Sequence, residues 1–467
     1  MRKTKIICTL GPASARAGVL RRMIEKGADA FRINMSHATH EWVREIVPQV
    51  RAFARELRRP IALLLDTQGP AIRTGDVKAD LQLKPGDVLE FTVRGSQPKE
   101  RYSVEVNYGD FPQDVAPGDT VLVDNGMIKL LVLDTKKDRV RSKVLTPATL
   151  GSRRHINLPG VYVRLPPLTR KDLADVALGA ELGVEFVALS FVREKSDIEQ
   201  LRKLLAKKKS RARIIAKIEN QLAVRALDTM IESADAIMVA RGDLGIECPM
   251  EELPVIQRRI VKRCLRFGKP VVVATQLLES MIANPSPTRA EVTDVANAVF
   301  EQADALLLSG ETSIGRYPIE CVEILDRVAR RIERSGGAGY AQSIALEDMR
   351  QKLVASAVVL ANSLDRAKIV VFTRSGTMAR NVANMRPERA PIFAFTPGEE
   401  VQRQLSISWG VSPLLLKFRT DPNATIEAAE KYVRENKLTE RGDHLVVITD
   451  LQAGRQRVDT VQLRPIK

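Results

Sequence analysis

The segment RARIIAKIEN (residues 211–220) ends an apolar stretch with two opposite charges. Side chains alternate between the faces of a β-strand, so Lys217 and Glu219 share one face and the apolar residues 214, 216 and 218 share the other. A carboxylate is a ligand that Mg2+ or Mn2+ prefers, whereas a lysine neutralises an anion. The spacing therefore predicts a site where a bound anion meets both a lysine and a divalent metal ion.

Other apolar stretches also end in polar residues. The segment FRINMS (31–36), for example, puts Arg32, Asn34 and Ser36 on one face. The full set is Arg32, Asn34, Ser36, Asp66, Thr67, Arg73, Ser190, Lys217, Glu219, Arg241, Asp243, Thr275, Ser309 and Glu311. Such residues either cap helices and pair with one another or form a functional site, and charges confined to the ends of several strands favour the site.

The residue types in this set predict phosphoryl transfer. Glu219 and Asp243 are the expected ligands of Mg2+ or Mn2+. Lys217 would neutralise a transferring phosphoryl group or a developing enolate, unless it only pairs with Glu219. Arg32 and Arg73 add forked donors for phosphate oxygens.

Gly242 and Thr275 complete the predicted site. In ARGDLG (240–245) the glycine lets a backbone N–H approach a carboxylate, and the Thr275 hydroxyl would close the opposite wall. The alternative for Thr275 is an N-cap of the helix that follows.

Short apolar runs, each followed by a stretch of helical period, must position these residues. They span residues 5–10, 30–35, 61–66, 186–191, 213–219, 236–241, 270–275 and 305–310. These repeated units predict an α/β fold, a parallel (β/α)8 TIM barrel whose strands end together at one mouth. The catalytic barrel is expected over 1–73 and 166–336.

Two further domains are expected. Residues 74–165 interrupt the barrel with alternating strand patterns separated by Pro-Gly-Asp and Asp-Asn-Gly turns, which predicts an inserted β-barrel domain that acts as a lid. After a Gly- and Ser-containing linker, helices and apolar runs alternate again over 340–467. This pattern predicts a C-terminal three-layer α/β domain, a candidate for effector binding and subunit contacts.

The composition is that of a globular enzyme with a basic surface. Of 467 residues, 28% are charged and 4% aromatic, and the formal net charge is +16. The basic run 202–213 is interpreted as the solvated end of a surface helix and not as a nucleic-acid site, because no aromatic residues are interleaved for base stacking. Scattered cysteines, no leader pattern and no membrane-length apolar stretch favour a cytoplasmic protein without a membrane partner.

A set of motifs resembles the pyruvate kinase family over essentially the whole chain. The motifs are TKIICTLGPAS, FRINMSHA, LLLDTQGPAIRTG, INLPGVYV, IIAKIEN, IMVARGDLGIE, VVVATQLLESM and LLLSGETSIGRYP. The resemblance implies transfer of the phosphoryl group of phosphoenolpyruvate to ADP, giving ATP and pyruvate, in the last step of glycolysis. It also implies Mg2+ or Mn2+, usually K+, and a homotetramer.

The resemblance also implies roles for individual residues. The catalytic residues would be Lys217, Thr275 and Arg32, the Mg2+ ligands Glu219 and Asp243, and the phosphoenolpyruvate contacts Arg32, Gly242, Asp243 and Thr275. The K+ site would be Asn34, Ser36, Asp66 and Thr67, and the nucleotide contacts Arg73, His37, Asn34 and Arg154.

Several positions depart from the family pattern. Ala71 stands where the family usually has Glu, and Gln68 where it has Lys. Relatives with Lys in place of that Glu tend to work without K+, so the K+ requirement is open. Leu222 and Ala223 replace Glu-Gly beside the active site, and His155 replaces a glycine, so lid closure or nucleotide affinity is expected to differ.

A loop in the last domain has the residues of a phosphate site. In FTRSGTMAR (372–380), the residues Thr373, Ser375, Gly376 and Thr377 either hold the phosphate of an effector at a helix N-terminus or form a plain N-cap. The family's Gly-Thr-Thr-Asn effector loop is replaced by QRVD (456–459), which argues against control by a sugar phosphate.

Two other functions compete with the kinase. A non-catalytic nucleotide- or nucleic-acid-binding paralogue would be expected to have lost Lys217, Glu219 or Asp243, and all three are present. A lyase of the phosphoenolpyruvate and pyruvate barrel group needs no ADP site, and Arg73 and the long insertion argue against it.

Overall fold

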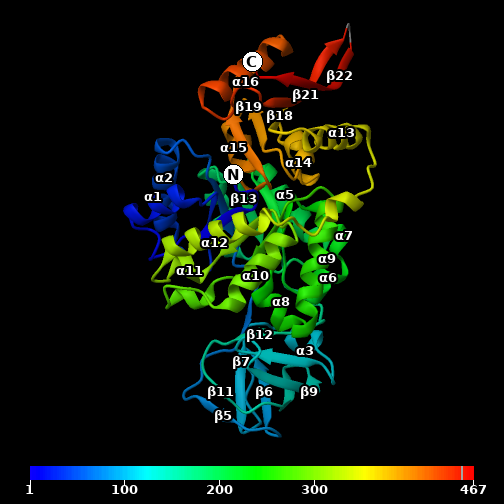
Figure 1. Cartoon of the computed structure of the whole chain (residues 1–467). Helices are drawn as coiled ribbons and strands as arrows, with labels where there is room; N and C mark the ends of the chain where they lie inside the picture. The colour runs from blue at the N-terminus through cyan, green and yellow to red at the C-terminus, as the bar shows by residue number, and fades with distance from the viewer. Residues whose placement is uncertain (454–455, 467) are drawn as a thin grey trace.

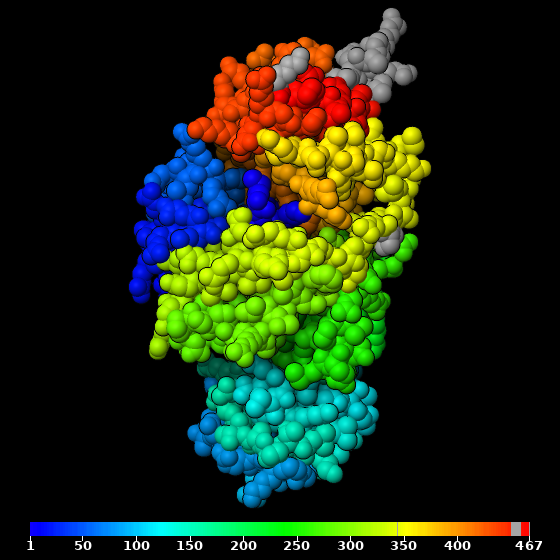
Figure 2. All heavy atoms as spheres, in the orientation of Figure 1, coloured from blue at the N-terminus to red at the C-terminus, as the bar shows by residue number. Residues whose placement is uncertain are grey.

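The chain folds into three bodies arranged in a row (Figure 1). The computed structural model describes residues 1–453 and 456–466. A barrel lies in the middle, the inserted domain projects from one end of it, and the C-terminal domain covers the other end (Figure 2). The proposed domain limits are 1–73 and 166–336 for the barrel, 74–165 for the inserted domain and 340–467 for the C-terminal domain. No helix in the described ranges is long and apolar enough to cross a membrane.

The middle body is a closed barrel of parallel strands, which confirms the predicted (β/α)8 fold. In barrel order the strands are β1 (Lys5–Thr9), β17 (Ala305–Leu308), β16 (Val271–Ala274), β15 (Ala236–Ala240), β14 (Arg213–Ile218), β13 (Phe186–Leu189), β3 (Ala62–Asp66) and β2 (Ala30–Asn34). The helices around it are α1 (Ala17–Lys26), α2 (His40–Glu56), α4 (Arg170–Glu181), α5 (Lys195–Lys207), α6 (Gln221–Arg225), α7 (Leu227–Ser233), α8 (Arg241–Glu247), α9 (Leu253–Arg266), α10 (Arg289–Phe300), α11 (Gly310–Ser313) and α12 (Pro318–Glu333).

Strand alternation decides which residues face the barrel interior. On β14, Ile214, Ala216 and Ile218 pack against the surrounding helices, whereas Ile215 belongs to the small apolar cluster that fills the barrel. Lys217 is two residues after Ile215 and therefore lies on the inward face, at the end of the strand. The basic run that precedes β14 forms the exposed end of α5 and the turn after it, as expected.

The inserted domain is a nearly closed β-barrel with its own apolar core. Its strands are β5 (Leu81–Leu83), β6 (Val88–Val93), β7 (Tyr102–Val106), β8 (Thr120–Val123), β9 (Ile128–Lys136), β10 (Arg139–Val144), β11 (Ala148–Leu150) and β12 (His155–Asn157), with one short helix, α3 (Phe111–Asp114). The sheet also takes in β4 (Ile72–Arg73), which lies just before the proposed limit at residue 74. The core includes Phe91 and Phe111, whose rings meet edge to face. The first strand, β4, pairs with the last, β12, so the chain leaves the barrel and returns to it at one place.

The C-terminal domain is a mixed sheet between two helical layers. The strand order is β20 (Val411–Leu415), β19 (Ile392–Thr396), β18 (Ala367–Phe372), β21 (His444–Ala453) and β22 (Gln456–Pro465), and only β22 runs antiparallel. The helices α13 (Met349–Ser363), α14 (Thr377–Asn384) and α15 (Glu399–Gln404) pack on one face, and α16 (Pro422–Glu435) packs on the other. The predicted three-layer arrangement is therefore confirmed.

A buried carboxylate joins the barrel to the C-terminal domain. Glu185, which precedes β13, is fully buried and accepts hydrogen bonds from Arg51 of α2 and from Arg403 of α15. Asp304, before β17, pairs with Arg386 after α14 at 2.8 Å. Because Glu185 and Asp304 are each paired with arginine, the interface between the two domains buries these carboxylates without leaving them unpaired.

Candidate active site

The functional side chains gather where neighbouring barrel strands end. Lys217 of β14 is 8% exposed, and its Nζ lies 2.8 Å from Glu219 Oε1 and 3.2 Å from Asp66 Oδ1. The same Nζ donates to Ser190 Oγ at 2.7 Å. Burial alone would lower the pKa of Lys217, but Asp66 and Glu219 raise it above its ordinary value. The ion pair with Glu219, considered above as the alternative role of this lysine, is therefore present.

Arg32 of β2 completes a row of alternating charges. Its Nε donates to Asp66 Oδ2 at 2.6 Å, and its Nη1 donates to Thr9 Oγ1 at 3.2 Å. Burial alone would raise the pKa of Asp66, but Lys217 and Arg32 hold it below its usual range. Arg32 is only partly buried, so its remaining N–H groups can reach an anion at the mouth.

Glu219, the first predicted metal ligand, has one carboxylate oxygen on a backbone N–H and the other beside Lys217. Glu219 is 1% exposed, and its Oε2 accepts the N–H of Phe191 at 2.5 Å. Among the described residues Glu219 Oε1 has one polar partner, the ion pair with Lys217 Nζ at 2.8 Å. Burial, together with the nearby Asp243 carboxylate, raises the pKa of Glu219 to about 7 despite Lys217. A second cation beside Glu219 would therefore be stabilising.

Asp243 stands in the first turn of α8, directly after β15, the strand next to β14. No group of three or more His, Cys, Asp or Glu side chains forms a metal cage within 1–453 and 456–466. Two carboxylates with open coordination positions suit Mg2+ or Mn2+, which keep water and substrate oxygens as their other ligands. The residues present therefore fit the predicted metal ion.

Thr275 follows β16, two strands from β14 in the barrel order, and has a strained backbone. Its φ is +70°, which is rare for a β-branched residue, and such strain is concentrated at functional sites. Its Oγ1 accepts the N–H of Gly242 at 2.8 Å, and its carbonyl accepts a hydrogen bond from Arg241. No helix is capped by Thr275, because the chain continues into a 3-10 turn at Glu279–Ile282. The N-cap alternative is therefore wrong.

The expected K+ ligands lie at the ends of two adjacent strands. Asn34 of β2 and Asp66 of β3 are partners in the strand register. Asn34 Oδ1 accepts the N–H of Ser36 at 3.2 Å, and Thr67 Oγ1 donates to the carbonyl of Ala188. The four residues are therefore neighbours, and the Asp66 carboxylate among them already carries two cationic partners.

The expected nucleotide contacts Arg73, His37 and Arg154 lie outside the row of charges formed by Arg32, Asp66, Lys217 and Glu219. Arg73 and His37 are exposed, and Arg73 donates to the carbonyl of Arg153. Arg154 points within the inserted domain, where its Nη1 lies 3.4 Å from Asp124 Oδ1. His155 is the register partner of Arg73, and burial lowers its pKa with help from Arg73.

The loop that was expected to bind an effector phosphate lines a cavity in the C-terminal domain. Thr373, Ser375 and Thr377 face it, together with Arg374 and Arg419. The N-cap of α14 is Gly376, in the left-handed region, without a side-chain cap. Of the QRVD segment (456–459), the side chains of 456–458 lie outside the described residues.

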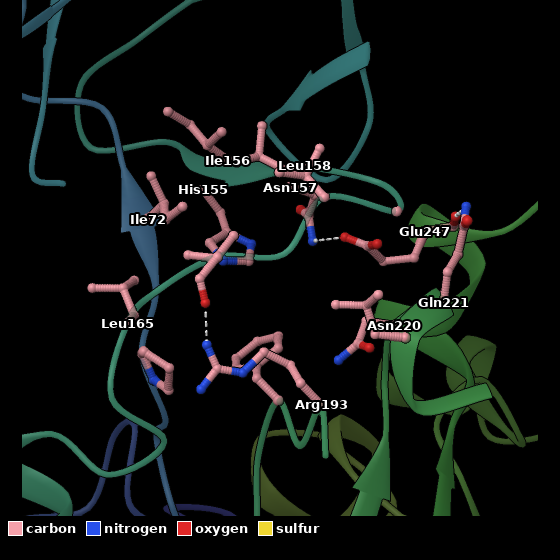
Figure 3. A pocket seen from close by; sticks show the side chains of 16 residues that line it. Ile72, His155, Ile156, Asn157, Leu158, Leu165, Arg193, Asn220, Gln221 and Glu247 are labelled. Carbon is pink, nitrogen blue, oxygen red and sulfur yellow. Dashed lines mark hydrogen bonds between the residues drawn. The ribbon is translucent and has the colours of Figure 1, made fainter. Parts of the chain in front are cut away.

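Sequence reasoning missed the residues that hold functional side chains in place by hydrogen bonds. Thr9 supports Arg32, the Phe191 N–H supports Glu219, and Asn157 of β12 donates to Glu247 of α8 at 3.3 Å (Figure 3). Asn157 and Glu247 both stand in motifs quoted above, INLPGVYV and IMVARGDLGIE. Nothing in those motifs indicates that the two residues meet.

The fold and this site define a class of enzyme. Barrel enzymes carry their active sites at the carboxyl ends of the strands. Here that mouth offers a buried lysine, an arginine and open carboxylates, which suit a phosphorylated, anionic substrate bound with a divalent metal ion. The class is a metal-assisted phosphoryl-transfer enzyme on a TIM barrel.

Comparison with known proteins identifies the family. Residues 1–322 match the family described as "Pyruvate kinase, barrel domain", and residues 351–463 match "Pyruvate kinase, alpha/beta domain". The chain belongs to the pyruvate kinase family. Within this family, divalent and monovalent cations are generally used.

Individual relatives match over nearly the whole chain. Pyruvate kinase 2 of Synechocystis sp. is 39% identical over 100% of this chain and 80% of its own length. The pyruvate kinase of Geobacillus stearothermophilus is 40% identical over 96% of this chain and 77% of its own. The crystal structure of a pyruvate kinase from Cryptosporidium parvum superposes with a TM-score of 0.94 at 34% identity, covering 100% of this chain and 96% of that one. The relatives include bacterial and chloroplastic proteins.

Replacing Glu219 tests the metal site without an activity assay. Glu219→Gln removes the ionised oxygen, so we expect Mn2+ to bind about tenfold more weakly or worse, as measured by electron paramagnetic resonance. The matched control is Glu311→Gln, a buried carboxylate at the end of β17 that accepts two backbone N–H groups. Equal Mn2+ affinity in wild type and Glu219→Gln would contradict the assignment.

Proposed function

We propose that the chain transfers the phosphoryl group of phosphoenolpyruvate to ADP through the residues at the barrel mouth. The observation that carries this assignment is the buried Lys217, held between carboxylates on the inward face of a pyruvate kinase barrel. The non-catalytic alternative gains no support, since Lys217, Glu219 and Asp243 are all in place.

Substrate binding is assigned to the row of donors around the mouth. Arg32 would hold phosphate oxygens with its forked guanidinium. The Gly242 N–H, which now donates to Thr275 Oγ1, would exchange that partner for the carboxylate of phosphoenolpyruvate. Glu219 and Asp243 would hold Mg2+. When bound, this ion would supply positive charge to the phosphate and carboxylate oxygens. Arg73, His37, Asn34 and Arg154 would reach the phosphates of ADP as the inserted domain closes.

Lys217 is assigned the chemical step. Its Nζ has three donor positions, now directed at Asp66, Glu219 and Ser190. When substrate binds, one of these donors would turn to the phosphoryl group, and it would then stabilise the enolate oxygen left after transfer. Its raised pKa keeps it charged at neutral pH. Thr275 is assigned a place near the proton that is delivered to the enolate carbon.

Lys217→Met should abolish turnover while sparing the fold. Methionine keeps most of the volume but removes the charge, so we expect kcat for pyruvate formation to fall about 10³-fold or more. The control is Lys5→Met. Lys5 is also a buried lysine on a barrel strand, but at the opposite end, where it donates to the carbonyl of Val411. Near-normal turnover in Lys217→Met would refute the role.

We further propose that K+ binds at Asn34, Ser36, Asp66 and Thr67. The support is the adjacency of Asn34 and Asp66 in the strand register, together with the family's general use of a monovalent cation. Turnover is expected to be severalfold higher in K+ than in tetramethylammonium. Ala71→Lys should remove this dependence by placing a fixed cation where the family has Glu. Equal wild-type turnover in both salts would show that Arg32 and Lys217 neutralise Asp66 without K+.

An effector phosphate is proposed for the loop Thr373, Ser375, Gly376 and Thr377. The cavity beside this loop is also lined by Arg374 and Arg419, which can pair with an anion. Inorganic phosphate and sugar phosphates are expected to shift the KM for phosphoenolpyruvate, and Ser375→Asp should abolish the shift by repulsion. The proposal fails if no phosphate compound shifts KM or binds in calorimetry.

Two further proposals concern the assembly and the location of the chain. We propose a homotetramer, which sedimentation velocity would detect as four times the 51.8 kDa chain. A cytoplasmic location is proposed because Cys8, Cys248, Cys264 and Cys321 are all free thiols.

A further inference from the structure

The inserted domain meets the barrel at α8 and at the loop after β14. Asn157 Nδ2 donates to Glu247 Oε1 at 3.3 Å (Figure 3). Two glycines of the inserted domain also approach this region. A Cβ on Gly160 would lie 3.2 Å from Gln221 Oε1, and a Cβ on Gly126 would lie 3.5 Å from Cγ2 of Ile246. The inserted domain therefore rests on the two segments that carry the proposed metal ligands.

Glu247 lies where these contacts converge. It is the last residue of α8, four positions after Asp243, so the two side chains are one helical turn apart on the same side. Its backbone carbonyl accepts a hydrogen bond from Gln221 Nε2 at 2.6 Å. The residue is 8% exposed, and its carboxyl group accepts the Asn157 hydrogen bond.

The loop after β14 is fixed in the same network. Asn220 caps α6 by accepting the N–H of Ala223 at 2.9 Å, and its Nδ2 donates to the carbonyl of Val192 at 3.0 Å. Gln221, the next residue, holds α8 through the Glu247 carbonyl. Glu219 directly precedes Asn220, so one proposed metal ligand is connected to Glu247 through Asn220 and Gln221 and the other through α8.

The Asn157–Glu247 contact leaves one polar atom, Asn157 Oδ1, without a hydrogen bond among the described residues. Asn157 is 5% exposed. Burial raises the pKa of Glu247 to about 7, with the Asn157 hydrogen bond opposing this change. The pocket beside the pair is lined by apolar residues such as Leu158, Val161 and Leu222 and also by the polar Asn220 and Gln221, which are bound to the Val192 and Glu247 carbonyls. A buried amide and carboxyl are therefore directed at one another.

We propose that Glu247 is a positioning residue that couples the inserted domain to the metal-binding helix. Its hydrogen bond with Asn157 connects it to β12, and its place in α8 connects it to Asp243. A change in the position of β12 would therefore change the orientation of Asp243. Movement of the inserted domain over the mouth would thus be transmitted to the metal site. The inference rests on the proposed function, because only there does the setting of Asp243 matter for the reaction.

Substitutions on both sides of the contact test the coupling. Glu247→Ala is expected to weaken Mn2+ binding about tenfold, since residues that orient metal ligands typically contribute 10–100-fold to affinity. Asn157→Ala should weaken it similarly, and the double variant should be no worse than either single one. Glu247→Gln, which can still accept from Asn157 and can donate to its Oδ1, should stay within about threefold of wild type. Electron paramagnetic resonance of Mn2+ gives the affinities, and kinetics give KM for ADP and kcat.

A control separates positioning from stability. Glu90 is a fully buried carboxylate inside the inserted domain, where it accepts from Arg139 and the N–H of Lys99. Glu90→Gln should lower the melting temperature and leave Mn2+ affinity unchanged. If Glu247→Ala behaves like Glu90→Gln, the coupling is refuted.

The remaining outcomes are also decisive. Additive effects of the Asn157 and Glu247 substitutions would mean that each acts alone, which overturns the proposal. If Glu247→Ala does not fold, Asn157→Ala and Glu247→Gln decide by the same Mn2+ criterion. Wild-type protein without turnover would refute the proposed function, whereas Mn2+ affinities would still report on the coupling.

Discussion

The structure depends on burying a lysine between two carboxylates at the end of a barrel strand. An isolated charge is costly in such a place, and a paired one is tolerated only when its partners are held in position. Here the charges alternate in space as Arg32, Asp66, Lys217 and Glu219. The row follows neighbouring barrel strands, β2, β3 and β14, and Ser190 after β13 fills the place between. Only a closed barrel brings these strand ends within contact distance.

The neutrality of this row explains how the site can take up highly charged ligands. Two cations and two anions balance one another before substrate arrives. A phosphorylated, carboxylated substrate adds negative charge, and a divalent ion beside Glu219 adds positive charge, so both are expected to bind together. The part of the mouth after β15 and β16 has a different character, because there the Gly242 N–H and the Thr275 hydroxyl are bound to each other and the left-handed Thr275 holds them in place.

The sequence predicted the parts that depend on local pattern. Apolar runs with helical stretches between them identified the barrel strands, and residues at the ends of those runs identified Arg32, Asp66, Lys217 and Glu219 as neighbours. The Asn157–Glu247 contact was not predictable, because it joins residues 90 positions apart and depends on how the inserted domain sits on the barrel. The backbone of Thr275 was not predictable either, since a threonine in the left-handed region contradicts its own preference.

The pairing of β4 with β12 has a consequence for how the molecule could arise and change. The two ends of the insertion are hydrogen-bonded neighbours. For the barrel, the whole inserted domain is therefore equivalent to a short hairpin that connects β3 to β13. The entropy of closing that connection is then set by the hairpin and hardly by the length beyond it. A domain attached in this way can be enlarged, trimmed or exchanged while the barrel keeps its register, so the nucleotide side of the site can diverge independently of the phosphoryl-transfer side.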